Sequence, residues 1–144
     1  MKNNKVAGLS LVELMVVIAM IGILAAIALP SYNKLVQSER LTASANRLQS
    51  GFKFARSEAI KRGETVAMSV QNDLSIKVLA ADLTELRLIA APDTGVTIEG
   101  LADMVISPLG TTTAANILLA NSDRDLRLCI LRSGQSLLGG GNCP

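Results

Sequence analysis

The sequence contains no histidine and no tryptophan, and aromatic residues make up only 2% of it. Histidine is the commonest general base in enzymes and the commonest metal ligand in proteins, so its absence removes both roles. No phosphate-binding loop, dinucleotide fingerprint or CxxC motif is present, and the triple glycine at 139–141 lacks the strand-to-helix context of a phosphate loop. We therefore expect no enzymatic activity, no bound metal and no cofactor.

Cysteine is scarce, and both cysteines, Cys129 and Cys143, lie near the C-terminal end of the sequence. Two thiolates alone do not complete a structural zinc site. In a cytosolic protein they would be free thiols, whereas behind a membrane-targeting segment they would form one disulfide in an oxidising compartment. The second alternative requires such a segment, and the N-terminal part of the chain supplies a candidate.

Net charge is also small. The formal value is +2, with 14 basic and 12 acidic residues. Lys2 and Lys5 both precede Gly8, so the chain after Gly8 has equal numbers of basic and acidic residues. Such a chain has no overall electrostatic attraction for nucleic acid, and any affinity would need a local basic patch.

A long apolar run dominates the first part of the sequence. The 16 residues from Leu14 to Leu29 carry no charge, and the 21 residues from Leu9 to Leu29 are enough to span a bilayer as a helix. Lys2 and Lys5 would hold the preceding segment on the cytoplasmic side. Three interpretations compete: a plain transmembrane anchor, a secretory signal peptide cut after Ala28, and a short leader cut after Gly8.

Glu13 helps to choose among these interpretations. A carboxylate inside a membrane span costs roughly 2.5–3.5 kcal/mol at the bilayer centre and less near the interface. A signal peptide or a simple anchor gains nothing from this residue. If the chain begins at Leu9 after cleavage, the new α-amino group lies four residues from Glu13. The two opposite charges could then pair, within one chain or between neighbouring chains.

Residues 8–14, GLSLVEL, resemble the cleavage motif of type IV pilins and type II secretion pseudopilins. The following MVVIAMIGILAAIALPSY is similar to the N-terminal helix of these proteins, and one difference is Leu9, where the family usually has phenylalanine. The resemblance implies cleavage between Gly8 and Leu9 by a prepilin peptidase, N-methylation of Leu9, and a role of Glu13 in filament assembly. It also implies residence in the bacterial inner membrane as a single-pass protein with a periplasmic C-terminal domain, followed by transfer to a pilus or pseudopilus.

The helical pattern continues beyond the apolar run. Pro30 removes one backbone hydrogen bond, and because helical spacing resumes after it we expect a kink there, not an end. The apolar positions then follow one another at steps of four and three, which places them on one helix face: Leu41, Ala45, Leu48, Phe52, Ala55 and Ala59. Gly63 follows Arg62 as a left-handed C-cap. We expect one helix from Leu9 to Arg62, roughly 80 Å long.

After Gly63 the sequence changes to short β-rich runs separated by turn signals. The predicted strands are Thr65–Val70, Ser75–Leu79, Leu86–Ala90, Val96–Glu99, Met104–Ser107, Asn116–Ala120 and Leu126–Arg132. The segment Ala80–Leu83 is ambiguous, and no regular structure is expected for the C-terminal GGGNCP. The predicted fold is α+β, with the long helix packed on an antiparallel β domain of two small sheets. The predicted divisions are a leader at 1–8, a transmembrane or filament-core helix at 9–29, its amphipathic continuation at 30–63 and a globular β domain at 64–144.

The segment ANRLQSGFKFARSEAIKRGETVAMSV also resembles the start of the GspH/FimT domain. This narrows the resemblance to the FimT and FimU minor pilins and the GspH minor pseudopilins. The implied function is assembly into a type IV pilus, in an initiating or tip complex that supports pilus biogenesis, motility or adhesion. The implied partners are other major and minor pilins or pseudopilins, the prepilin peptidase and the inner membrane. One alternative is a pseudopilin of type II secretion.

The other alternative is a DNA receptor for natural transformation. Three arginines lie close together in the sequence, at Arg124, Arg127 and Arg132. DNA-binding FimT proteins resemble this region but carry a G-R-x-R motif, where this chain has GQSL at 134–137. Basic side chains supply most non-specific DNA affinity, so the difference weakens the DNA interpretation. We favour solvated side chains for these arginines, and likewise for Arg56, Lys61 and Arg62 near the helix end, where cations suit the dipole.

Overall fold

The computed structural model describes residues 11–143, apart from the side chains of Ala28 and Pro30. The chain divides into two compact units, residues 1–35 and 36–144, and helix α1 (Leu11–Arg62) contributes to both. The residues expected to form the leader and the cleavage site, including Gly8 and Leu9, lie outside the described part of the chain.

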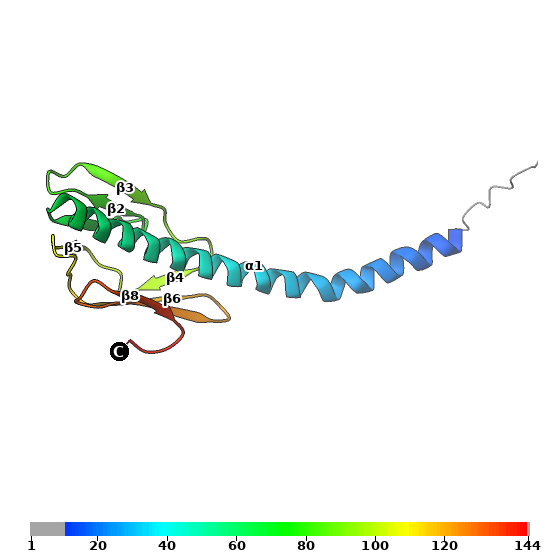
Figure 1. Cartoon of the computed structure of the whole chain (residues 1–144). Helices are drawn as coiled ribbons and strands as arrows, with labels where there is room; N and C mark the ends of the chain where they lie inside the picture. Colours follow the sequence, from blue (N-terminus) through cyan, green and yellow to red (C-terminus); the bar gives the residue numbers. More distant parts are fainter. Residues whose placement is uncertain (1–10, 144) are drawn as a thin grey trace, which may run out of the picture. The chain divides into compact units, whose positions relative to one another are not determined.

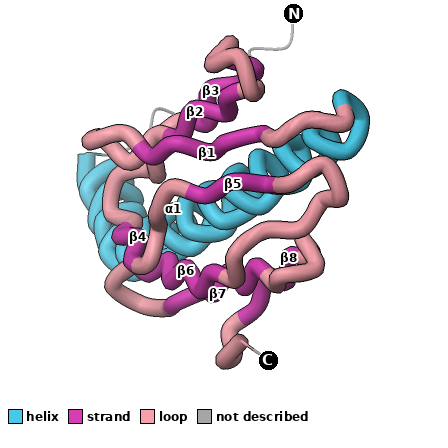
Figure 2. The backbone as a smooth tube through the Cα atoms, turned by 90° about the vertical axis from the view of Figure 1, so that its left-hand side faces the viewer, coloured by secondary structure: helices cyan, strands magenta, loops and turns pink. Residues whose placement is uncertain are grey.

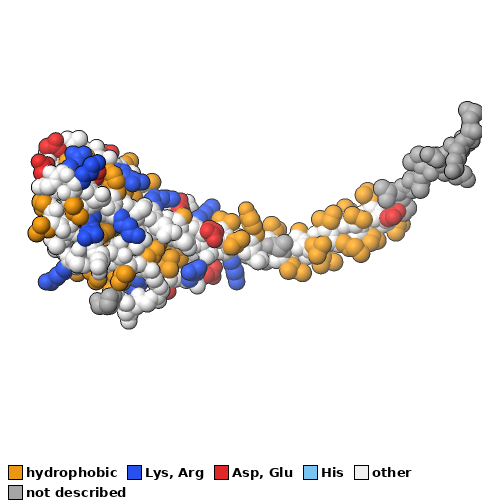
Figure 3. Space-filling view, in the orientation of Figure 1, with side chains coloured by type: hydrophobic (Ala, Val, Ile, Leu, Met, Phe, Trp, Pro, Cys, Tyr) orange, Lys and Arg blue, Asp and Glu red, His pale blue; other side chains and the backbone are white. Residues whose placement is uncertain are grey.

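The first unit is the N-terminal part of α1. Every described side chain from Leu11 to Leu35 is exposed, and Figure 3 shows the hydrophobic side chains on the visible face of this segment. An 18-residue window in the helix reaches a mean hydropathy of 2.7, so α1 is apolar and long enough to cross a membrane by length and composition. The helix continues through Pro30, as predicted, while the kink expected there stays a prediction.

The second unit begins with the remainder of α1, and here the predicted apolar stripe is confirmed. All six of its residues are buried, with Leu41, Phe52 and Ala55 fully inaccessible. The helix ends at Arg62, and Gly63 adopts a left-handed φ of 67°. Its N–H donates to the carbonyl of Ala59 at 3.0 Å, which completes the predicted C-cap.

Eight strands follow the helix. They are β1 (Val66–Val70), β2 (Ile76–Leu79), β3 (Glu85–Ile89), β4 (Thr97–Glu99), β5 (Met104–Ile106), β6 (Ala115–Ala120), β7 (Asp125–Ile130) and β8 (Ser136–Gly139). They form two antiparallel four-stranded sheets, sheet A in the order β3-β2-β1-β5 and sheet B in the order β4-β6-β7-β8. The α+β class with two small sheets is confirmed.

A single hydrophobic core joins the helix to both sheets. In Figure 1, β2 and β3 lie on one side of α1, and β4, β6 and β8 lie on the other; Figure 2 shows β1 and β5 crossing in front of the helix. Phe52 from the helix, Val66 from sheet A and Leu128 from sheet B are all fully buried in this core. Among the described buried residues of this core Phe52 is the only aromatic one, and Phe54 packs against the core from a partly buried position.

The structure adds one strand that was not predicted and shows what the ambiguous segment forms. Strand β8 was not predicted, because its four residues are flanked by glycines and carry little strand pattern of their own. It is formed by pairing with β7, in which Leu137 lies opposite Cys129 and Leu138 opposite Leu128. The ambiguous segment Ala80–Leu83 is a turn, closed by the bond from the Leu83 N–H to the Ala80 carbonyl at 3.0 Å.

Candidate functional site

The N-terminal part of α1 combines an exposed apolar surface with one acid in its first turn, Glu13. Ile27 and Leu24 expose 70% and 67% of their surface, and Glu13 is the only ionisable residue between Leu11 and Tyr32 apart from the tyrosine itself. A continuous apolar surface of this kind marks a membrane or protein contact. The side chain most suited to electrostatic pairing in that contact is Glu13, near the helix end that favours negative charge.

At the other end of the helix, Arg56 does not belong to a solvated basic face as predicted. Its Nε donates to the carbonyl of Gly110 at 3.0 Å, and its NH2 group donates to the carbonyl of Ser133 at 3.4 Å. These carbonyls belong to turns that follow β5 and β7. Arg56 therefore attaches one turn beside each sheet to the helix, a role that is structural.

The two turns held by Arg56 approach each other closely. Gly134 has a left-handed φ of 76°, and a Cβ atom there would overlap the carbonyl oxygen of Gly110 and contact Arg56. A residue without a Cβ is therefore required at this point. Sequence reasoning identified neither contact, because carbonyl groups are present at every position and leave no sequence signal.

The other two cations of the predicted cluster remain on the surface. Arg62 Nε lies 2.8 Å from Glu58 Oε2, and Lys61 Nζ lies 3.9 Å from Glu58 Oε1. The hydrogen bond from Arg62, supplemented by the nearby charge of Lys61, holds the pKa of Glu58 below its ordinary value. The solvated interpretation therefore fits Lys61 and Arg62 but not Arg56.

Replacing Arg56 by leucine tests the structural role. We expect the free energy of unfolding to fall by about 1–2 kcal/mol, because two carbonyl groups lose a charged donor at a partly buried position. A change of this size lowers the melting temperature by roughly 5–10 °C. Thermal unfolding followed by circular dichroism measures it. Lys53→Leu, three residues earlier on the exposed helix surface, should change stability by less than about 0.5 kcal/mol. Equal melting temperatures for the two variants would contradict the assignment.

A second set of contacts holds the loop between β3 and β4. Arg47 lies 3.1 Å from Asp93 Oδ2 and also donates to the carbonyl of Ala91 at 2.8 Å. Ser44, a buried polar residue of the helix, donates its hydroxyl hydrogen to Asp93 and accepts a bond from the Asp93 N–H. This pairing joins residues more than 40 positions apart, and no local pattern in the sequence predicts it.

The three arginines considered for DNA binding do not act as one patch. Arg124, in the turn before β7, donates to the Ser38 hydroxyl of the helix at 3.0 Å. Arg132 follows the opposite end of β7, and Arg127 lies between them on the strand. Eight residues of extended chain separate Arg124 from Arg132 by about 26 Å. The structure therefore gives no support to a compact nucleic-acid site built from these residues.

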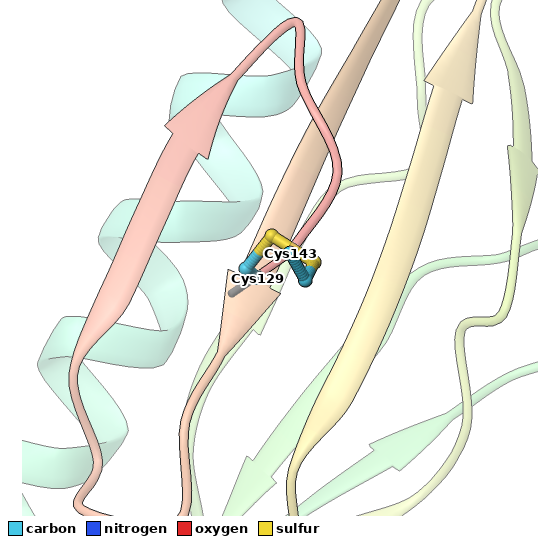
Figure 4. The surroundings of a disulfide bond; sticks show 2 residues. All are labelled: Cys129 and Cys143. Atoms are coloured by element: carbon cyan, nitrogen blue, oxygen red, sulfur yellow. A yellow bond between two sulfur atoms is a disulfide. The ribbon is translucent and has the colours of Figure 1, made fainter.

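The predicted disulfide is present. Cys129 on β7 and Cys143 in the tail are bonded, with their Cα atoms 5.5 Å apart. Figure 4 shows the chain turning back after β8 so that Cys143 lies beside Cys129. The bond fastens the tail to a central strand of sheet B, a position that its glycine-rich sequence could not hold alone. Among residues 11–143, no group of three or more histidine, cysteine, aspartate or glutamate side chains is placed to bind a metal.

Two protein-family models match this chain. The model for the type II transport protein GspH matches residues 44–134, well over half of the chain. The chain belongs to the GspH family. A second model, the prokaryotic N-terminal methylation motif, matches residues 3–29. This GspH-family chain is thus a type IV pilin-like subunit with the methylation motif, and proteins of this kind are structural subunits, not enzymes.

Individual relatives of the GspH-family chain are pilins. It is 42% identical over 72 residues to the type IV major alpha-pilin of Moraxella bovis, a match covering 50% of this chain and 45% of the relative. It is 41% identical over 69 residues to a fimbrial protein of Pseudomonas aeruginosa, covering 48% of this chain and 43% of the relative. The chain thus spans less than half the length of these curated relatives.

Among solved structures, the chain is similar to the type IV minor pilin FimU of Pseudomonas aeruginosa. The TM-score is 0.61 at 17% sequence identity, with 70% of this chain and 89% of FimU covered. A second crystal form of FimU gives a TM-score of 0.57 at 18% identity. At this identity the similarity establishes a shared fold.

Proposed function

We propose that the protein is a minor pilin that is cleaved between Gly8 and Leu9, N-methylated at Leu9 and assembled into a type IV pilus. The observation that carries the proposal is the methylation motif at residues 3–29, followed in the same chain by the GspH domain at residues 44–134, here called the head. Before assembly the apolar half of α1 rests in the inner membrane. After assembly the same surface packs against the helices of other pilin subunits.

The charge at Glu13 would make the packing of the helix in the filament specific, because it needs a partner of opposite charge there. Cleavage after Gly8 would create a positively charged amino group at Leu9, close to an acid that lies among apolar side chains. A charge left alone in an apolar filament core is strongly disfavoured, and an oppositely charged partner offsets much of that cost. Glu13 of one subunit would pair with the methylated amine of its neighbour and so set the register between helices.

Processing provides the direct test. When the full chain is expressed with a prepilin peptidase, we expect mass spectrometry to find a chain that begins at Leu9 and carries one added methyl group. Replacing Gly8 by valine changes the residue on the leader side of the cut and should leave the chain unprocessed. Cleavage after Ala28 instead would support the signal-peptide interpretation and contradict the proposal.

A second candidate is a minor pseudopilin of type II secretion, favoured by the match of residues 44–134 to the type II transport protein GspH. Both candidates use the same processing and the same helix. The genes beside the coding sequence distinguish them, because a cluster of minor-pilin genes supports the pilus and a secretion operon supports the pseudopilus.

A further inference from the structure

A groove separates the last turns of α1 from the turn and strand at residues 134–137. It has a volume of about 730 Å³. One wall is formed by helix residues spaced three or four positions apart, which lie on one face of α1. The other wall is formed by the turn before β8 and the first residues of that strand. The lining residues are Lys53, Arg56, Ser57, Ile60, Lys61, Gly134, Gln135, Ser136 and Leu137.

The groove lining is basic and contains no carboxylate. Arg56 is already committed to two carbonyl groups. Lys53 has no ion pair within the described part of the chain. The Lys61 side chain is 76% exposed and lies 3.9 Å from Glu58. Arg62 binds the same carboxylate more closely, at 2.8 Å. Two lysines therefore remain available to a ligand. Eight residues of helix place them about 12 Å apart.

Strand β8 adds a backbone donor. It is the last strand of sheet B, so its outer edge is paired with no other strand in the described part of the chain. The Leu131 N–H donates to the Gln135 carbonyl, so these two residues form a hydrogen-bonded pair at the turn between β7 and β8. Hydrogen-bonded and non-hydrogen-bonded pairs alternate along antiparallel strands. The next pair, Ile130 and Ser136, is therefore not hydrogen-bonded, and the N–H and carbonyl groups of Ser136 point away from β7. The Ser136 carbonyl accepts a bond from the Gln49 side chain at 3.2 Å. The Ser136 N–H remains directed to this edge.

The groove also offers apolar contacts. Ile60 on the helix wall and Leu137 on the strand wall expose 50% and 48% of their surface. Exposed aliphatic side chains between available cations suit a ligand that alternates acidic and aliphatic groups. In an extended chain, residues four apart lie about 13 Å apart on the same side, close to the separation of the two lysines.

We propose that this groove binds an extended peptide segment of a partner protein, with acidic residues four positions apart and aliphatic residues between them. Lys53 and Lys61 bind the two carboxylates, and Ile60 and Leu137 contact the aliphatic side chains. The Ser136 N–H donates to a peptide carbonyl. DNA is the less favoured occupant, because two available lysines neutralise few phosphates and DNA affinity depends on many such contacts.

A blocked peptide of sequence Glu-Leu-Thr-Leu-Glu provides the probe, titrated into the full chain in neutral detergent at low salt. Isothermal calorimetry should detect binding, and the amide resonance of Ser136 should shift in the NMR spectrum. The double variant Lys53→Gln, Lys61→Gln should weaken the affinity at least about tenfold, since both charge pairs are lost. The matched double variant Lys34→Gln, Lys77→Gln has the same net charge and should bind as the unmodified protein does.

Two further peptides separate charge from spacing. Gln-Leu-Thr-Leu-Gln, which keeps the shape but lacks the charges, and Leu-Glu-Glu-Thr-Leu, which keeps the composition but moves the acids together, should both bind at least about tenfold more weakly. Equal affinity of all three peptides overturns the proposal, as does equal loss in the two double variants. Binding of a double-stranded oligonucleotide at this groove, without binding of the acidic peptide, also overturns it in favour of DNA. These tests do not depend on the proposed role in the pilus.

Discussion

Replacing Glu13 by alanine is expected to leave the subunit in the membrane but to exclude it from filaments. The apolar run that holds the helix in lipid is unchanged, and the loss of a carboxylate only lowers the cost of membrane insertion. In the filament, the methylated amine of Leu9 would lose its partner in an apolar core. Removing one member of a buried ion pair costs about 3–5 kcal/mol. Incorporation should therefore fall by a hundredfold or more, because 1.4 kcal/mol corresponds to about a factor of ten.

The measurement compares the subunit content of sheared pili with that of the inner-membrane fraction by quantitative immunoblotting. Glu39→Ala is the matched control, because Glu39 is an exposed acid farther along the same helix and should leave both fractions unchanged. Glu13→Gln separates charge from shape and should behave as the alanine variant does. Normal incorporation of either Glu13 variant would show that assembly does not use this charge.

The second large effect is expected from removing the disulfide. Replacing Cys129 and Cys143 by serine opens a loop whose ends are 14 residues apart in sequence. In the chain-entropy account, a closed loop of this length contributes about 3 kcal/mol. The melting temperature of the head should fall by about 10–20 °C. Circular dichroism measures this change in the full chain in detergent.

Reduction of the unmodified protein provides the control. A reducing agent should lower its melting temperature by a similar amount and should not affect the double serine variant. We expect β8 and the tail to loosen first, since the disulfide fastens the segment that follows this edge strand. An unchanged melting temperature in the variant would mean that pairing between β7 and β8 holds the tail without the covalent bond.

The parts of the fold that the sequence predicted are those with a periodic or local signal. The stripe from Leu41 to Ala59 follows the helical period and is buried throughout, and Gly63 ends the helix where a left-handed residue was expected. Strand β8 escaped prediction because its pairing with β7 is a property of the folded chain. Leu74 and Leu83 adopt left-handed φ values of 64° and 66°, for which leucine gives no signal.

The functional residues divide in the same way. Glu13 was identified because an acid inside an apolar run contradicts the pattern around it. The contacts of Arg47 with Asp93 and of Arg56 with the Gly110 carbonyl join residues distant in sequence, and many other cations on the helix looked equivalent to them. Charge and spacing in the sequence indicated which residues could bind a partner. Only the folded domain showed which cations, such as Arg47 and Arg56, are already bound within the chain.

The use of main-chain oxygens as acceptors has an evolutionary consequence. Arg47 binds the main-chain oxygen of Ala91, and Gln49 binds that of Ser136. Arg56 binds the main-chain oxygens of Gly110 and Ser133. Every amino acid carries such an oxygen, so these contacts fix the path of the chain without specifying its side chains, in contrast to the bonds of Arg47 and Ser44 to the Asp93 carboxylate. Apart from Asp93 and sterically restricted positions such as Gly134, the loops can diverge while the helix continues to hold them. Related domains can thus acquire different surfaces, and different partners, while these main-chain contacts are kept.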